Sequence, residues 1–106
     1  MRAGTLRHRV TIQTLARTAD DGGGYTEAWS NVATVWARVE PLSGGERWEA
    51  QQITANLSHR VAMRYRNDVT ANNRLLFGAR RLRIDAVIDV GERREQLEIL
   101  CEEERI

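Results

Sequence analysis

Alternation of apolar and polar residues is the feature that most constrains this chain, because a period of two places every second side chain on one face of a β-strand. The alternation is clearest in residues 59–65 and 82–90. The residues expected to form the two buried faces are His59, Val61, Met63 and Tyr65, and then Leu82, Ile84, Ala86, Ile88 and Val90. Both stretches are therefore predicted to be half-buried strands.

Further segments fit strands less directly. Residues 7–15 are rich in β-branched side chains, and residues 33–40 alternate with an aliphatic face that ends at Val39. Residues 97–102 also alternate, although their Glu and Leu content leaves a helix open. Two short strands are expected at residues 25–29 and 74–77. The run Asp20-Asp21-Gly22-Gly23-Gly24 provides positive-φ positions, so a hairpin tip is predicted there.

Residues 43–58 interrupt the strand pattern. Ser43 and Glu46 have the spacing of a capping box, in which each side chain accepts a backbone amide hydrogen of the other residue. This spacing predicts a short helix from Gly44 to about Ile53, placed as an excursion between two strands. A loop of this length inside a compact domain usually has a function.

About six short strands, separated by turns and carrying one inserted helix, predict an all-β fold that is a small antiparallel barrel or sandwich. The length of 106 residues predicts a single domain that spans residues 1–106. No stretch approaches the roughly 18 apolar residues of a membrane span. Cys101 is the sole cysteine and cannot form an internal disulfide, which fits a reducing compartment.

The sequence offers no catalytic, cofactor or metal site. His8 and His59 lack neighbouring ligands at metal-binding spacing, so each is interpreted as a partly buried strand residue. Asp85 and Asp89 would lie about 13 Å apart along one strand, which is too far for an acid/base pair, and both are expected to be solvated. No nucleophile or phosphate-loop motif is present. We therefore do not expect an enzyme.

Three tryptophans carry large potential contact area. In a barrel of this size one tryptophan usually fills the core, so a core position is considered first for each. Trp36, however, shares a face with Thr34 and Arg38, opposite the aliphatic set, and Trp48 lies on the predicted helix. Trp36 and Trp48 are therefore expected to cover partner surface.

All 16 basic residues are arginine, and 15 acidic residues leave a net charge of +1. Two arginine groups stand out, namely Arg60, Arg64 and Arg66, and Arg80, Arg81 and Arg83. They could line a groove for single-stranded nucleic acid. Because there is no basic excess and no interleaved aromatic series, ion-paired strand faces or contacts between subunits are favoured. The candidate intersubunit residues are Trp36, Arg60, Arg64 and Arg66.

Nearly the whole chain, taken in order, resembles the phage head-tail adaptor or head-completion (stopper) family. The similar segments are residues 4–13, Asp21-Gly22-Gly23-Gly24 followed by Trp29, residues 35–42, Gly45-Glu46, Met63-Arg64-Tyr65-Arg66, residues 78–84 and residues 97–102. No single segment is specific for this family, but the succession of all of them in order over nearly the whole chain is.

The resemblance implies a small β-barrel of long-tailed phages, prophages and gene transfer agents. Such proteins form a ring beneath the portal and its adaptor, hold packaged DNA and offer a face to the tail. The implied partners are the portal or adaptor ring, tail proteins and copies of the chain itself, near packaged DNA but without sequence-specific binding, with no membrane and no cofactor. The implied location is the bacterial host cytoplasm during assembly and then the virion.

Within this family the excursion at residues 43–58 would face the channel lumen or grip a neighbouring subunit. The residues selected for that role are Ser43, Glu46, Arg47, Trp48, Glu49 and Gln52. The alternative function that the residues leave open is a single-stranded nucleic-acid-binding β-barrel.

Overall fold

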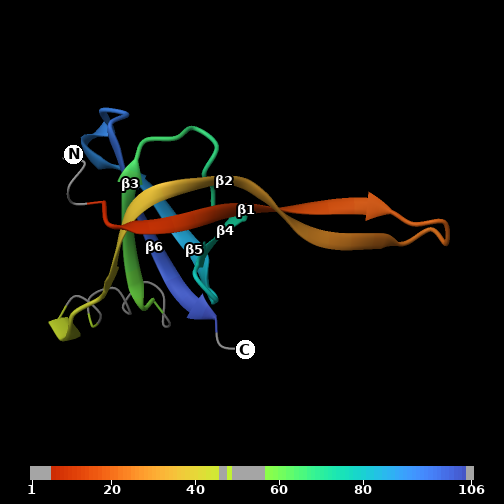
Figure 1. The fold of residues 1–106 in the computed structure, drawn as a ribbon, viewed down its shortest axis with the longest axis horizontal. Helices are drawn as coiled ribbons and strands as arrows, with labels where there is room; N and C mark the ends of the chain where they lie inside the picture. The colour runs from red at the N-terminus through yellow and green to blue at the C-terminus, as the bar shows by residue number, and fades with distance from the viewer. Residues whose placement is uncertain (1–5, 46–47, 49–56, 105–106) are drawn as a thin grey trace.

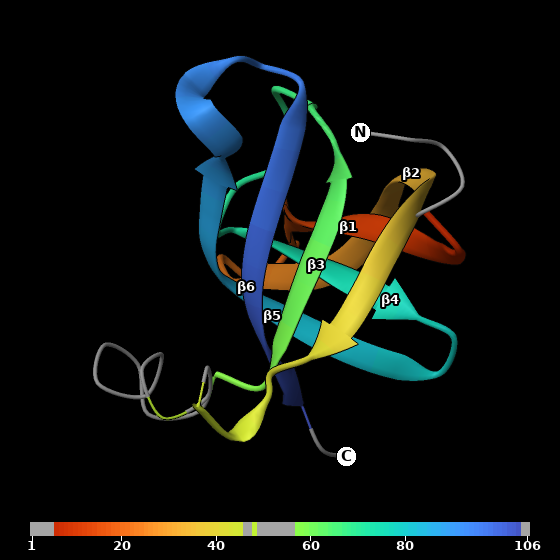
Figure 2. The same cartoon turned by 90° about the vertical axis from the view of Figure 1, so that its left-hand side faces the viewer.

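The computed structural model describes residues 6–45, 48 and 57–104. The strands are β1 (His8–Ala19), β2 (Tyr25–Pro41), β3 (His59–Arg64), β4 (Asn73–Phe77), β5 (Arg80–Asp89) and β6 (Gln96–Glu104), with a 3-10 turn, η2 (Val90–Glu92), before β6. Every neighbouring pair is antiparallel, and the strands close into a barrel in the order β1-β2-β3-β6-β5-β4 (Figures 1 and 2). The all-β prediction is confirmed, and the barrel rather than the sandwich is the architecture found.

Aliphatic side chains from all six strands fill the barrel. The most deeply buried of the large ones are Ile12, Met63, Leu75, Leu82, Ile99, Val10, Val61 and Cys101. The buried face predicted for residues 59–65 is confirmed at His59, Val61 and Met63, but Ala62, predicted on the opposite face, is buried as well, and the strand ends at Arg64. Leu97 and Ile99 are buried on β6, so the helix left open for this segment does not form.

The first two strands are longer than predicted. β2 runs without a break through both segments expected to be separate strands, and Val32 is an extra residue opposite the step from Ile12 to Gln13 of β1. Such a bulge bends the strand pair and increases its twist while keeping the pairing continuous. The predicted hairpin tip lies between β1 and β2, as expected.

β5 departs from the prediction at its second half. A bulge at Asp85 shifts the register against β6 between Ile84 and Ala86. The inward face therefore changes: Val87 packs against the core, whereas Ile88 is 44% exposed and Val90 is 38% exposed. The prediction that Ala86, Ile88 and Val90 continue the face of Leu82 and Ile84 was wrong, because one inserted residue exchanges the two faces of a strand.

None of the three tryptophans lies in the core, so the core position considered first is not found even for Trp29, for which no outward position was argued. Trp29 is 36% exposed, Trp36 50% and Trp48 66%. The aliphatic residues of six strands already fill the interior, which leaves no space there for an indole. The outward position predicted for Trp36 is confirmed.

The excursion at residues 43–58 is described in part. Gly44, Gly45 and Trp48 have helical geometry, which agrees with the predicted start of a helix. At the base of the excursion the Leu42 amide donates to the Ser58 carbonyl at 2.9 Å. The remaining residues of the predicted helix, including Glu46, Arg47, Glu49 and Gln52, lie outside the described residues.

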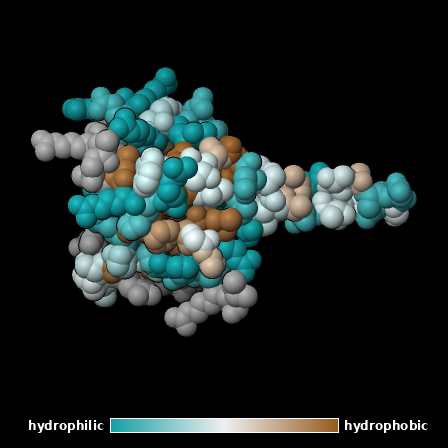
Figure 3. All heavy atoms as spheres, in the orientation of Figure 1, coloured by the Kyte–Doolittle hydropathy of each residue, from teal (hydrophilic) through white to brown (hydrophobic). Residues whose placement is uncertain are grey.

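The C-terminal part of β1 and the N-terminal part of β2 project from the barrel as a two-stranded arm, which we define as residues 15–29. β1 pairs with β4 only from Thr11 to Thr14, so beyond that point it pairs with β2 alone. The molecule consequently measures 49 × 29 × 27 Å, with a radius of gyration of 15.0 Å. A compact chain of this length has a radius of about 13 Å. Figure 3 shows the arm as a narrow, mostly hydrophilic or neutral projection beside a barrel with more apolar surface.

Candidate functional site

The arm ends in a tightly hydrogen-bonded turn. The Asp20 carboxylate accepts the amides of Gly22 at 2.8 Å and Gly24 at 2.9 Å, and the Asp20 amide donates to the Gly24 carbonyl at 2.9 Å. Gly23 has a φ of +84°, a conformation that glycine adopts at little cost. The turn presents Asp21 and the 72% exposed Tyr25 to the surroundings.

The base of the arm is tied to the barrel by a polar cluster. Gln13, which is 8% exposed, donates to Asn31 Oδ1 at 2.8 Å and accepts from Arg74 Nε at 2.7 Å. The Arg74 guanidinium lies 4.2 Å from the ring centroid of Trp29, and Asn73 donates to the Gln13 carbonyl. Burial, followed by the charge of Arg81, lowers the pKa of Arg74. These contacts join β1, β2 and β4 at the point where the arm leaves the barrel.

A groove lies at the end of the barrel where β3 finishes. Its volume is about 310 Å³, and its lining residues are Leu6, Val35, Trp36, Arg64, Tyr65 and Arg66. We call it the Trp36 groove. Three of the four predicted intersubunit residues meet here, whereas Leu6 and Tyr65 were not singled out from the sequence. The Arg9 guanidinium lies 4.9 Å from the Trp36 ring centroid.

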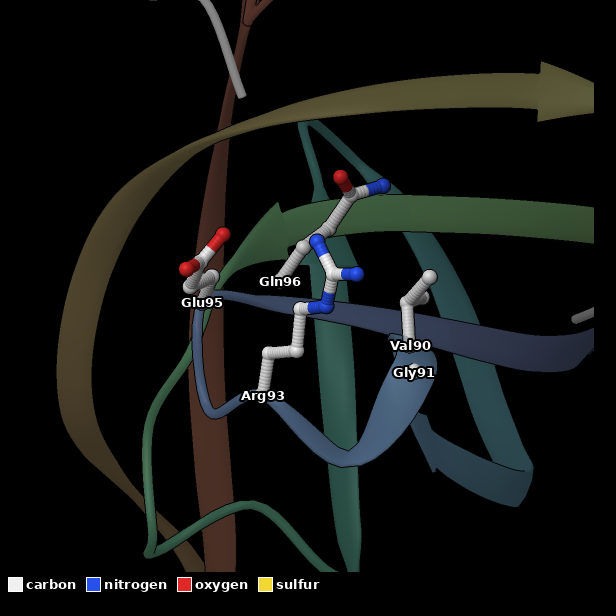
Figure 4. Close-up of a pocket in the computed structure, with 5 residues that line it drawn as sticks. All are labelled: Val90, Gly91, Arg93, Glu95 and Gln96. Atoms are coloured by element: carbon white, nitrogen blue, oxygen red, sulfur yellow. The ribbon is translucent and has the colours of Figure 1, made fainter.

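A second hollow adjoins this groove. It is lined by Val90, Gly91, Arg93, Glu95 and Gln96, and in Figure 4 the Arg93 side chain extends from the loop towards Gln96 on β6. The Tyr65 amide donates to the Glu95 carbonyl at 3.1 Å, which joins the two loops. This end of the barrel is therefore uneven, and it combines apolar and basic groups.

The opposite end of β3 carries the base of the excursion. His59 Nδ1 lies 2.8 Å from Ser58 Oγ, and its Nε2 lies 3.0 Å from the Arg80 guanidinium. Because a guanidinium only donates, Nε2 is the acceptor, and the neutral ring carries its proton on Nδ1 and donates to Ser58. Arg80 also pairs with Glu103, whose amide donates to Ser58 Oγ at 2.9 Å. These contacts explain His59 as a structural strand residue.

Many of the outer arginines are ion-paired. Arg60 contacts Glu40 at 3.2 Å and Glu98 at 3.8 Å, and it is not among the residues that line the Trp36 groove. Arg66 makes a two-point contact with Asp68, which lowers the pKa of Asp68. Ion-paired faces of this kind were favoured over a nucleic-acid groove, and they interrupt the continuous basic track that phosphate binding needs.

Asp85 does not have the solvated position that was expected. The bulge turns it towards Glu102, and its Oδ2 is buried without a hydrogen-bond partner among the described residues. Burial, followed by the charge of Asp85, raises the pKa of Glu102. The pair lies on β5 and β6 beside Arg83 and does not border any of the hollows named above, so we interpret it as a repulsive contact within the sheet and not as part of a site.

Within the described ranges, no group of three or more His, Cys, Asp or Glu side chains could hold a metal ion. The part of the chain with described structure also contains no helix long and apolar enough to cross a membrane. Burial, followed by the charge of Asp85, raises the pKa of the Cys101 thiol to about 12, so this cysteine is unreactive near neutral pH.

Solved structures support the fold at high coverage. A solution structure of protein SF1141 from Shigella flexneri 2a matches with a TM-score of 0.80 and 37% identity, over 97% of this chain and 96% of that chain. A chain from the virion of a native gene transfer agent particle matches with a TM-score of 0.66 and 27% identity, over 93% of this chain and 96% of that chain.

Sequence comparisons point the same way. The head completion protein gp7 of Enterobacteria phage HK97 is 36% identical over 75 residues, which cover 71% of this chain and 67% of that protein. The family model of the phage head completion protein matches residues 1–104. The chain therefore belongs to the phage head completion protein family, whose members are structural virion components without enzymatic activity.

Proposed function

We propose that this protein joins the portal or adaptor of a phage head to the tail and helps to retain packaged DNA. The observation that carries the proposal is the family match over residues 1–104, supported by the likeness to a chain of a gene transfer agent virion. A barrel with an arm on one side, a groove at one end and an excursion at the other offers separate surfaces to several neighbours. That arrangement suits a connector better than a binding module with one ligand.

The proposed partners are the portal or adaptor ring, tail proteins and further copies of this chain in a ring. In this role the excursion at residues 43–58, with the 66% exposed Trp48, faces the lumen or a neighbour. Trp36, Arg64 and Arg66 contact the adjacent subunit through the groove that they line. Arg60 takes part through its ion-paired outer face. The protein lies close to packaged DNA without reading its sequence.

The test is deletion of the gene from a phage or prophage that produces particles, with the wild-type gene returned on a plasmid as the control. We expect electron microscopy to show DNA-filled or leaking heads that are separate from free tails. We also expect nuclease treatment of the deletion lysate to destroy DNA that is protected in complemented particles. Normal tailed particles with protected DNA in the deletion strain would overturn the proposal.

Nucleic-acid binding by the isolated protein is a separate measurement. The ion-paired arginines lead us to expect no tight, steeply salt-dependent binding of a labelled single-stranded oligonucleotide. Binding that is tight at low salt and falls steeply as salt rises would favour a nucleic-acid-binding barrel instead.

A further inference from the structure

We infer that the tip of the arm of one copy inserts into the Trp36 groove of the next copy, and this inference rests on the proposed connector function. The arm touches its own barrel at its base, where Trp29 stacks against Arg74, and from there it projects away from the core. Apart from the half-buried Leu15, every residue of the arm is exposed. A two-stranded hairpin without a face to cover is marginally stable alone. An element of this kind is expected where another surface completes it.

An arm cannot reach the groove of its own subunit. The groove includes Leu6, just before β1 begins, whereas the tip follows Ala19, where β1 ends. The 12 residues of β1 extend over about 40 Å at the usual rise per residue. Since the two surfaces lie at opposite ends of one rigid strand, the arm can fill only a groove on another molecule.

The two surfaces are chemically complementary. The groove has apolar and aromatic walls from Leu6, Val35, Trp36 and Tyr65, and a basic rim. The tip offers one large aromatic side chain, Tyr25, which is 72% exposed. A tyrosine can bury its ring in such a groove while its hydroxyl stays at the wet rim, and tyrosine, tryptophan and arginine dominate the energetic centres of interfaces.

Charge orients the same contact. The arm carries Asp20, Asp21 and Glu27 against one arginine, Arg17, so it is acidic. Asp20 is used by the turn and Glu27 pairs with Arg17, which leaves Asp21 at the tip as the carboxylate to present. On the groove rim Arg64 is exposed, and none of the ion pairs among the described residues includes it. Asp21 is therefore placed to pair with Arg64 of the neighbour.

An arm on one side and a groove on another make a head-to-tail contact, which closes into a ring when the rotation between copies allows it. One tip and one groove form a small interface, and small interfaces are weak when they act singly. Each copy in a closed ring uses both surfaces, so the contacts support one another once a template holds the copies together.

Cross-linking between two single-cysteine variants tests the contact. Asp21→Cys and Arg64→Cys are purified separately, mixed at high concentration and treated with a short bis-maleimide. Cys101 stays unmodified because it is buried and its thiol pKa is raised to about 12. We expect a covalent dimer in the mixture and little in either variant alone. Arg83→Cys, on the exposed outer face of β5, replaces Arg64→Cys as the matched control and should yield about tenfold less dimer.

The role of the aromatic side chain is tested in the same system. Tyr25→Ala in the Asp21→Cys chain should reduce the dimer about tenfold, whereas Tyr25→Phe and the exposed arm variant Thr18→Ala should leave it unchanged. The same cysteine pair is also co-expressed in assembling particles and cross-linked there. Dimers no more abundant than with Arg83→Cys, in both the mixture and the particles, would overturn the inference. Head-to-tail joining in those particles is scored separately, so the connector function can stand if the arm contact fails.

Discussion

At the scale of single residues, repulsion between the Asp85 and Glu102 carboxylates destabilises the folded protein at neutral pH, and a substitution can remove it. Glu102→Gln keeps the shape, replaces one of two facing carboxylates by an amide that can donate to Asp85, and breaks the 3.6 Å contact with the exposed Arg83. We expect the free energy of unfolding at pH 7 to rise by roughly 0.5 kcal/mol. Thermal denaturation followed by circular dichroism measures this change, and a lower melting temperature for Glu102→Gln would contradict it.

The pH dependence of the same variant gives a second check. The folded-state pKa of Glu102 is raised above its ordinary value of 4.5, so the folded protein holds a proton that the unfolded chain releases. The stability from that proton is complete below pH 4.5 and is lost as the pH rises through the folded-state pKa. We therefore expect the advantage of Glu102→Gln to disappear in acid.

Asp68→Asn is the matched control with the opposite sign. Arg66 lowers the pKa of Asp68, so the stability from this pair is present above the ordinary value of 3.8 and is lost as the pH falls through the folded-state pKa. The substitution should lower the melting temperature at pH 7 and have little effect in strong acid. A loss that persists unchanged in strong acid would mean that the ion pair is not its cause.

At the scale of elements, the polar cluster at the base of the arm should limit the motion of the arm relative to the barrel. Gln13→Ala removes a hydrogen-bond partner from both Asn31 and Arg74, and each lost bond costs about 0.5–1.5 kcal/mol because these partly buried groups can still reach water. We expect Gln13→Ala to speed hydrogen exchange relative to the wild type, and to do so more at arm amides than at amides of β3 and β6. Arg17→Ala breaks only the exposed ion pair with Glu27, so its effect should stay below about 1 kcal/mol. Equal effects of the two variants would refute a bracing role for Gln13.

The excursion allows a prediction that separates folding from assembly. Trp48 is 66% exposed, so Trp48→Ala should leave the melting temperature of the isolated protein within about 1 °C of the wild-type value. In particles, the loss of this contact area should reduce tail joining or DNA retention, measured as infectious titre and nuclease-protected DNA. Trp29→Ala serves as the comparison: because this indole contacts Arg74, its loss should lower the melting temperature more than Trp48→Ala does. Normal titres from Trp48→Ala would contradict a docking role for Trp48 and the excursion.

At the scale of the whole molecule, we expect the isolated protein to be a monomer or a weak oligomer, with rings forming on a portal or adaptor template. Its apolar side chains largely fill the barrel, and the large exposed ones among the described residues are scattered over the arm, β2, the Trp36 groove, the excursion and the end of β5 with the loop after it. A surface of that kind is too small for a stable free ring. Sedimentation velocity at micromolar concentration decides the point, and a stable ring under those conditions would contradict it.

The sequence by itself determined the features that depend on local geometry. Period-two alternation placed Val61, Met63 and Ile99 on buried faces, since neighbouring side chains of a strand point to opposite sides whatever the partner. The hairpin tip at residues 20–24 was equally predictable, because the turn needs a carboxylate acceptor and a positive-φ glycine that follow one another in the chain. The outward position of Trp36 followed from the same alternation.

Only the tertiary structure decided the features that depend on which strand lies alongside. The bulges at Val32 and Asp85 are defined by a partner with one residue fewer, so the exposure of Ile88 and the joining of two predicted strands into β2 could not be deduced from spacing. The Trp36 groove joins Leu6 to Tyr65, from segments far apart in the chain. Closure of the barrel brings those segments together, and the packing of its interior left every tryptophan outside.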